Sequence, residues 1–428
     1  MSLSALPADE LARLEAQLAA EYDALAGKGL GLDLTRGKPS PEQLDLSERL
    51  LSLPGEGDYM SGGTDVRNYG GGEGLLELRT IIADLLGVGA GRVIARDNAS
   101  LSIMYDLVMF SMLFGTPDSD RPWKDEPKLR WLCPVPGYDR HFGITEAMGI
   151  EMITVPLRDD GPDMDEVERL VAEDPSIKGI WCVPIFANPT GTVYSDHTIS
   201  RLARMASAAP DFRIIWDNAY VVHTLTEDFP KVVDVDTLAE EAGHPNRFLQ
   251  VCSTSKMTFA GAGVSFLSAS RTNLDWYLKH AGVRTIGPNK VNQLAHARFF
   301  GDAAGVRAHM LAHREIVAPR FEAATEVLTR RLGEHEVARW TQPGGGYFID
   351  LEVVDGTASE TVRLAKEVGV ALTPAGSAYP YGLDPDDRHI RLAPTLPPLE
   401  EVETAMDVVG LCALLTACRA ELAARSAG

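Results

Sequence analysis

Short apolar runs alternate with amphipathic segments through the middle of the chain. Runs typical of buried strands lie at 129–134, 151–156, 180–186, 212–216 and 248–252, and segments with helical spacing lie among them at 138–148, 163–173 and 195–207. Such alternation is typical of a mostly parallel sheet with helices packed on its faces. The pattern therefore predicts an α/β fold.

The two ends of the chain differ from this middle part. Helical spacing predicts a helix over 8–26 and a long helix over 306–332 that leads out of the sheet. Beyond it, shorter strands and helices are mixed, which indicates a smaller α+β domain. We predict an N-terminal arm at 1–55 that packs with the small domain, a large α/β domain at 56–310 and the small domain at 311–428.

Charge and cysteine content argue against several classes of function. The 428 residues include 61 acidic and 40 basic side chains, a net charge of −21, which repels nucleic acid backbones and anionic membranes. We therefore expect no nucleic acid partner and no membrane, and no run of about 18 apolar residues is present to span a bilayer. Five cysteines without CxxC spacing fit a cytoplasmic protein with buried free thiols.

Polar residues follow several of the predicted strands, where ligands bind in parallel α/β sheets. Lys256 comes shortly after the run 248–252, behind serines at 253 and 255. Burial favours the neutral form of a lysine, and a neutral amine is a nucleophile and a base. This combination suggests a carbonyl cofactor held as a Schiff base and anchored by its phosphate. The alternative is a strand end followed by a solvated lysine.

The other strand ends suit the same cofactor. Asp217 ends a buried run, and a protonated pyridine nitrogen is a cation that a buried carboxylate can pair with. Asn188 and Tyr220 can bind the ring's phenolic oxygen, and Tyr138 can stack on the ring. Arg391, between two apolar residues, suits bidentate capture of a carboxylate. Each has an ordinary alternative: a turn with a helix cap, a loop, or an arginine on a half-exposed strand.

From about Leu34 to its end, the chain resembles the fold-type I pyridoxal-phosphate aminotransferases. The resemblance is to the class I group around aspartate aminotransferase, and in particular to divergent bacterial aspartate aminotransferases with an Arg-Gly-Lys-Pro arm. The matching motifs are Tyr69-x4-Gly74-x3-Leu78-Arg79, Pro136-Gly137-Tyr138, Asn188-Pro189-Thr190-Gly191, Asp217-x2-Tyr220, Ser253-x-Ser255-Lys256, Gly345-Gly346-Tyr347-Phe348 and Ile390-Arg391-Leu392.

The resemblance implies a mostly parallel seven-stranded sheet flanked by helices, a smaller α+β domain and pyridoxal 5'-phosphate as cofactor. It assigns catalysis to Lys256, Asp217 and Tyr220, with Lys256 carrying the cofactor. Tyr69 would reach the phosphate in the other subunit, which implies a homodimer with shared sites. The remaining implied contacts are Ser100, Leu101, Ser102 and Ser253 on the phosphate, Tyr138, Asn188, Asp217 and Tyr220 on the ring, and Gly37, Arg36, Asn188 and Arg391 on the substrate.

By this resemblance the chain moves an amino group from an amino acid, preferably aspartate, to a 2-oxo acid, preferably 2-oxoglutarate. The alternatives are an aminotransferase with another amino-acid specificity, a pyridoxal-phosphate β-lyase of the same fold, and a non-enzymatic protein that senses the cofactor. The distal carboxylate of the substrate has five candidate ligands: Arg36, Lys38, Arg140, Arg284 and Lys290.

The sequence departs from the family pattern behind the lysine. Ser265 stands where the family usually has an arginine that binds the phosphate, so Lys290 or a helix N-terminus is expected to take over that role. His309 and His313 lie four residues apart on the long helix. Without a third ligand nearby, they are expected to lie on a solvated helix face and to bind no metal.

Overall fold

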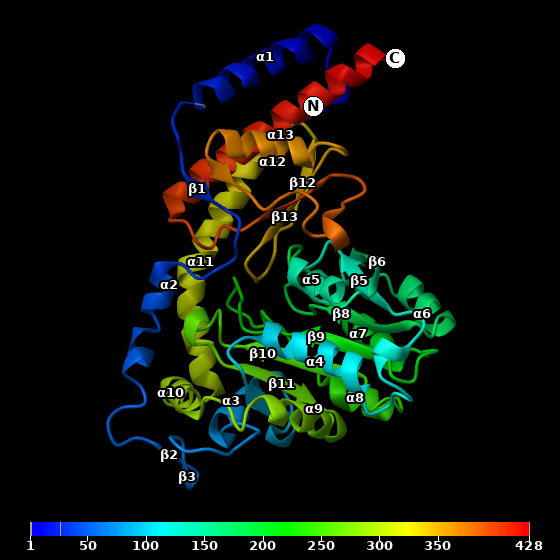
Figure 1. Cartoon of the computed structure of the whole chain (residues 1–428). Coiled ribbons are helices and arrows are strands. Elements are labelled where there is room, and N and C mark those ends of the chain that lie inside the picture. Colours follow the sequence, from blue (N-terminus) through cyan, green and yellow to red (C-terminus); the bar gives the residue numbers. More distant parts are fainter. Residues whose placement is uncertain (1, 26, 428) are drawn as a thin grey trace.

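The computed structural model describes residues 2–25 and 27–427. A large lower lobe contains the main sheet, and a smaller upper lobe contains both ends of the chain (Figure 1). The predicted helix at 8–26 is α1, Ala8–Leu25. Its predicted last residue, Ala26, lies outside the described residues, as do residues 1 and 428 at the ends of the predicted domains. The domain boundaries at 55/56 and 310/311 stay predictions.

Within the described residues, the main sheet has eight strands in the order β4-β11-β10-β9-β8-β5-β6-β7. Neighbours from β10 to β6 pair in parallel, β11 runs antiparallel to both of its neighbours, and β7 runs antiparallel to β6. The mostly parallel α/β sheet is thus confirmed, with one more strand than the predicted seven, since the two-residue β7 folds back on β6. The bounds are β4 Val93–Arg96, β5 Arg130–Val135, β6 Glu151–Arg158, β7 Gly161–Pro162, β8 Ile177–Cys182, β9 Arg213–Asp217, β10 Phe248–Ser253 and β11 Ser265–Ala269.

Helices cover both faces of this sheet. On β9, Ile214 and Trp216 belong to one apolar cluster and Ile215 to another, as the alternation of side chains along a strand requires. The cluster with Ile215 contains residues of α4 Ser100–Phe114, α5 Asp139–Ala147 and α9 Arg271–Arg284; the other contains residues of α6 Met164–Glu173, α7 Asp196–Arg204 and α8 Val235–Glu241. The sheet is therefore buried between two helical layers.

The small lobe is built on an antiparallel sheet, β12-β13-β15, and on long helices. Helix α11 connects the lobes: Val306 belongs to a core cluster of the large lobe and Val317 to that of the small lobe (Figure 1). Helix α1 packs against α13 in the small-lobe cluster. The remaining bounds are β1 Leu32–Asp33, α2 Pro41–Asp45, β2 Met60–Ser61, β3 Thr64–Asp65, α3 Leu76–Leu86, α10 Lys290–Phe300, α11 Ala303–Leu332, β12 Ala338–Trp340, β13 Ile349–Val353, α12 Ala358–Glu367, β14 Val370–Ala371, β15 His389–Leu392 and α13 Leu399–Ala427.

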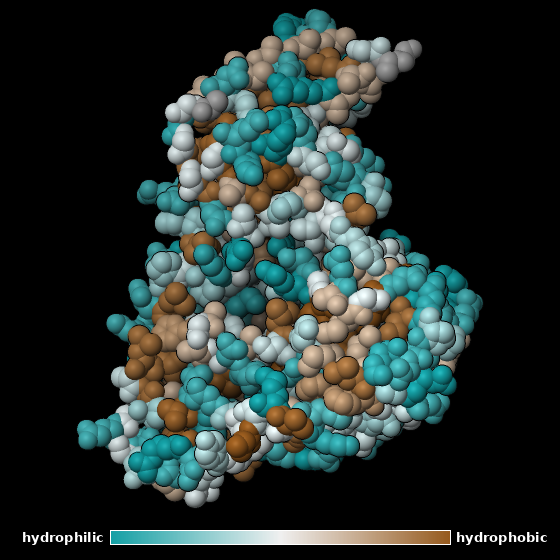
Figure 2. Space-filling model, in the orientation of Figure 1, coloured by the Kyte–Doolittle hydropathy of each residue, from teal (hydrophilic) through white to brown (hydrophobic). Residues whose placement is uncertain are grey.

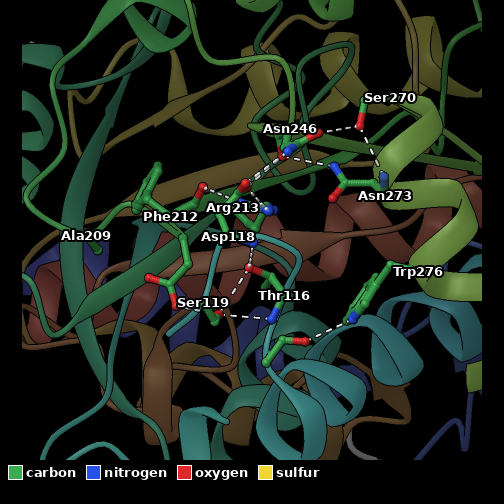
Figure 3. A network of polar contacts seen from close by, with 12 residues as sticks. Thr116, Asp118, Ser119, Ala209, Phe212, Arg213, Asn246, Ser270, Asn273 and Trp276 are labelled. Carbon is green, nitrogen blue, oxygen red and sulfur yellow. Dashed lines mark hydrogen bonds and ion pairs between the residues drawn. The ribbon is translucent and has the colours of Figure 1, made fainter. Parts of the chain in front are cut away.

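A polar network ties elements together near the start of β9, at the opposite end of that strand from Asp217 (Figure 3). The buried Arg213 donates to Asp118 at 2.5 Å, and Asn246 also donates to Asp118, at 3.0 Å. Ser270 and Asn273, at the start of α9, donate to Asn246. These hydrogen bonds hold the amino end of the strand to Asp118 and to the start of α9, while Arg213 Nε and Asn273 Oδ1 make no hydrogen bond within the described residues.

One predicted strand is displaced. Strand β8 ends at Cys182, although the apolar run continues to Phe186. Val183, Ile185 and Phe186 are buried in another core cluster after the chain leaves the sheet. At its other end the strand includes the buried Lys178, which is paired with Asp211 at 2.8 Å. The apolar run therefore indicates burial here and does not give the bounds of the strand.

All five cysteines of the chain are buried and unbonded to one another, as predicted. Among the helices in the described part of the chain, none is long and apolar enough to cross a membrane.

Candidate active site

A cavity of about 590 Å³ lies between the two lobes and brings together most of the predicted site residues. Figure 2 shows hydrophilic residues around the hollow between the lobes. Residues from the large lobe, the N-terminal segment and the small lobe all contribute to it. The predicted residues that line it are Tyr138, Asn188, Tyr220, Lys256, Arg391, Arg36 and Gly37, with Lys38 and Arg140 beside them.

Asp217 lies at the end of β9 and is 2% exposed. Its Oδ2 accepts a hydrogen bond from His141 Nε2 at 3.0 Å, and the ring of His141 stacks on Trp181 at 4.6 Å. Its Oδ1 is buried and has no hydrogen-bond partner among the described residues. A buried carboxylate oxygen of this kind is costly unless a ligand satisfies it, and a protonated pyridine nitrogen fits that requirement.

His141 was not among the residues selected from the sequence. It lies on α5 and is buried, like Asp217. A signal was available, because a helix was predicted directly after Tyr138, and a residue three positions along it returns to the same face. A histidine without a motif was not enough to select it.

Lys256 is half-buried, and its Nζ lies 5.0 Å from the centre of the Tyr220 ring. Burial lowers the pKa of Lys256, while the nearby charge of Asp217 acts in the opposite direction. Burial also raises the pKa of Tyr220 well above its usual value, so this phenol stays protonated. The pair therefore offers an amine that gives up its proton more readily than an exposed lysine does, and a nearby phenol that can donate a hydrogen bond.

Arg391 lies on β15 of the small lobe and is 9% exposed. Its Nη1 donates to Asp139 Oδ1 at 2.9 Å and lies 3.5 Å from Asn188 Oδ1. Its guanidinium lies 5.1 Å from the centre of the Phe348 ring. A Cβ on Gly37 would lie only 2.5 Å from Phe348, so glycine lets the N-terminal segment pack directly on this ring. Arg391, the predicted carboxylate ligand, and the N-terminal segment thus meet on the same side of the cavity, at Phe348.

Tyr138 directly precedes α5 and is half-buried in the lining of the cavity. Burial and the charge of Asp217 raise the pKa of Tyr138 to about 12, so the phenol is neutral. A neutral aromatic ring just beyond the carboxyl end of β5 is suited to stacking on another ring.

The predicted phosphate contacts meet outside the lining of this cavity. Ser100, Leu101 and Ser102 form the first turn of α4, where free backbone N–H groups attract anions. Ser253 Oγ donates to Ser255 Oγ at 3.2 Å, and Ser255 Oγ donates to Asn98 O at 3.4 Å, which brings the end of β10 beside the start of α4. The donors fit a phosphate.

Ser265 does not belong to this group. It is fully buried on β11, and its Oγ donates to Arg96 O at 2.5 Å. Lys290, the suggested replacement, donates through Nζ to Asn68 O and to Gly70 O, both at 2.6 Å. Lys290 therefore holds the loop that carries Tyr69.

The five candidates for the distal carboxylate separate into two groups. Arg36, Lys38 and Arg140 line the cavity and are exposed. Arg284 is paired with Asp97 and Asp106 beside another cavity, and Lys290 is engaged as described above. The candidates that line the cavity between the lobes are thus the first three.

Tyr69 lies apart from the cavity and is 82% exposed. The segment around residue 286 lies against the same loop, since a Cβ on Gly287 would be 2.8 Å from Gly70 O. Val283 and Ile286 are 90% and 68% exposed. Tyr69 and Ile286 are therefore exposed residues on two segments that lie against each other.

The prediction of a solvated face for the two histidines on α11 is wrong. His313 is buried, and its Nε2 lies 3.1 Å from His309 Nε2. His309 Nε2 also lies 2.8 Å from Met257 O, directly behind Lys256. Burial and the neighbouring His309 lower the pKa of His313 to about 3, so the pair packs as neutral rings behind the lysine.

Comparison with known proteins matches a family described as aspartate amino-transferase over residues 6–425. An aspartate aminotransferase from Corynebacterium glutamicum is 56% identical over 418 residues, which are 97% of this chain and 96% of that protein. A crystal structure of an aspartate transaminase from the same species has a TM-score of 0.97 and 55% identity, and covers 98% of this chain and 99% of that chain.

A more distant structure has the same fold. It is LysN, an α-aminoadipate aminotransferase from Thermus thermophilus, complexed with N-(5'-phosphopyridoxyl)-L-leucine. The TM-score is 0.72 at 22% identity, covering 92% of this chain and 94% of that chain.

Proposed function

The chain belongs to the aspartate aminotransferase family and is thus an enzyme that transfers nitrogenous groups; on this premise we propose that it moves the amino group of aspartate to 2-oxoglutarate with pyridoxal 5'-phosphate as cofactor. One observation carries the substrate assignment. A single cavity holds Lys256 and Arg391 together with three further cations, Arg36, Lys38 and Arg140. An amino acid with two carboxylates matches this set, because each carboxylate finds a cation while the α-carbon faces the lysine.

The cofactor roles follow from the groups at the strand ends. Asp217 Oδ1 would hold the pyridine nitrogen, and Tyr138 would stack on the ring. Asn188 and Tyr220 would bind the ring oxygen; the phosphate would lie against Ser100, Leu101, Ser102 and Ser253. When bound, pyridoxal phosphate supplies an electron-withdrawing ring that stabilises negative charge on the substrate's α-carbon.

Lys256 would attach the cofactor and then act as the base. Because burial lowers its pKa, its Nζ can be neutral and accept the proton of the substrate's α-carbon, and it would then deliver that proton to the former carbonyl carbon of the cofactor, on the other side of the transferred nitrogen. Tyr220, with its raised pKa, keeps its proton and donates a hydrogen bond throughout. Arg391 would hold the α-carboxylate so that the α-proton points to Nζ.

The proposal is tested by a half-reaction screen. The cofactor-loaded protein is mixed with single amino acids, and the absorbance of the cofactor is followed in the absence of any 2-oxo acid. Aspartate is expected to convert the absorbance fastest, and 2-oxoglutarate to reverse the change. If no amino acid converts it, the proposed transfer is wrong; release of pyruvate from a cysteine-type substrate indicates a β-lyase instead.

Removing a distal cation should affect aspartate selectively. Arg36→Met or Arg140→Met is expected to raise KM for aspartate about tenfold, the value of one charged hydrogen bond. KM for alanine, which lacks the second carboxylate, should change little. Steady-state kinetics with both amino acids checks this, with Arg158→Met, an exposed arginine paired with Asp163, as control. An equal loss for both amino acids contradicts a distal role.

We also propose that the protein is a cytoplasmic homodimer in which Tyr69 reaches the partner's phosphate site. The exposure of Tyr69, Val283 and Ile286 supports this, because large apolar side chains left exposed on neighbouring segments favour a partner. A cavity of about 580 Å³ beside Asn98 and Gly263 has room for an aromatic side chain. It lies next to the phosphate cradle, by which we mean Ser100, Leu101, Ser102 and Ser253.

Mixed dimers test the sharing of sites. Neither Lys256→Ala nor Tyr69→Ala chains should be active alone. Refolded together in equal amounts, they should recover about a quarter of the wild-type activity, because half of the dimers are mixed and each mixed dimer has one intact site. Activity after co-refolding, with each variant refolded alone as control, is the measurement. No recovery despite mixed dimers contradicts the shared site.

A further inference from the structure

The arginine proposed to bind the substrate's α-carboxylate already binds a carboxylate of the protein itself. Arg391 Nη1 and Asp139 Oδ1 are 2.9 Å apart. The Arg391 side chain is buried, whereas the Asp139 side chain is 34% exposed toward the cavity that both residues line. The incoming substrate therefore meets an occupied guanidinium.

This ion pair joins the two lobes. Asp139 is the first residue of α5, whose Phe142 packs in the core of the large sheet. Arg391 is on β15, and its neighbours Ile390 and Leu392 pack in the core of the small lobe. Asp139 is thus held by the core of the large lobe and Arg391 by the core of the small lobe, and the ion pair connects the two lobes at the cavity that both residues line.

The pair uses only part of the guanidinium. Asp139 contacts Nη1, while the other contacts of the fork, Asn188 Oδ1 and Thr373 Oγ1, are both at 3.5 Å. The buried Nε of Arg391 has no partner in the part of the chain that the structure describes. A free carboxylate can bind such a fork with two parallel hydrogen bonds. A substrate therefore can make a better contact with Arg391 than Asp139 does.

We propose that Asp139 is a placeholder for the substrate's α-carboxylate: it pairs with Arg391 before the substrate binds, and the substrate's α-carboxylate then takes its place on Arg391. This inference rests on the proposed role of Arg391. Substrate binding then breaks the ion pair between Arg391 and Asp139 and forms one between Arg391 and the substrate. It also brings the Asp139 carboxylate close to that of the substrate. Asp139 thus acts as a positioning residue that weakens the binding of every α-carboxylate ligand by a common factor.

Binding measurements on the cofactor-loaded protein test this exchange. Maleate, with two carboxylates, and propionate, with one, serve as unreactive probes in calorimetric titrations. Asp139→Asn should tighten both by a similar factor, about tenfold for the loss of one nearby like charge. KM for aspartate should fall by a comparable factor, with a smaller change in kcat. Asp159→Asn, which removes an exposed surface charge, should leave both affinities unchanged.

The other outcomes separate the two proposals. Weaker or unchanged binding of both probes to Asp139→Asn, or tighter binding of maleate alone, contradicts the proposal that Asp139 is a placeholder. Arg391→Ala should abolish binding of both probes. If it does not, the proposed carboxylate site at Arg391 is wrong, and the proposed role of Asp139, which depends on that site, is wrong as well. Should Asp139→Asn melt at a much lower temperature than the wild type, Asp139→Ser provides the same titration with a smaller side chain.

Discussion

Replacing Lys256 with alanine is expected to lower kcat for amino transfer at least about 10⁴-fold, since one side chain supplies both the covalent attachment and the proton transfer. Its position supports both roles. Nζ lies in the cavity beside Tyr220, and burial lowers its pKa. Single-turnover mixing with aspartate measures the chemical step, and the absorbance of the lysine-bound cofactor should be absent.

Two further variants separate chemistry from charge. Lys256→Arg retains a cation of similar length but cannot become neutral, because the guanidinium pKa stays above about 12. It should lose as much activity as the alanine variant. Lys231→Ala removes an exposed lysine that pairs with Asp196, and it should retain full activity. Residual amino transfer above about 1% of wild type in either Lys256 variant contradicts its proposed role as base.

Much of the large lobe could be predicted from periodicity, because its central strands are buried on both sides by helices. The antiparallel β11 and the neighbouring β4 were not predicted, and neither were α9 and α10. β11 contains two buried serines, Ser265 and Ser268, in its five residues, so it lacks a continuous apolar run. Conversely, the apolar run from Ile180 to Phe186 was predicted as a strand throughout, although β8 ends at Cys182. Local composition reports burial, and pairing depends on distant segments.

The motifs predicted the family, which the comparisons confirm, and several of the residues they named line the cavity. They did not identify residues that act through others. His141 contacts Asp217, and Asp139 contacts Arg391, across separations of 76 and 252 residues. The two histidines on α11 were placed in solvent because the elements that cover them, α2 and the loop after Lys256, are not recognisable as neighbours in the sequence.

Asp217→Asn should lower kcat about 10³-fold while the protein still binds the cofactor. The substitution preserves the shape of the side chain and removes its charge, so a protonated pyridine nitrogen would lose a buried ionic partner. Breaking a buried charge pair costs about 4 kcal/mol, which corresponds to about 10³ in rate when the charge is needed in the transition state. Lys256 and the phosphate cradle should still hold the cofactor.

A second buried carboxylate provides the matched control. Asp211 is 2% exposed, as Asp217 is, but it pairs with Lys178 and also accepts hydrogen bonds from Ser119 and Trp123, away from the cavity. Asp211→Asn should lower the free energy of unfolding in urea and leave kcat of the folded enzyme close to wild type. Asp217→Asn should instead lower kcat with a smaller change in the free energy of unfolding. The amide oxygen can still accept the hydrogen bond from His141 Nε2, and Oδ1 makes no hydrogen bond within the described residues that folding could lose. If both variants lose stability and neither loses turnover, Asp217 is a structural carboxylate and the pyridine assignment fails.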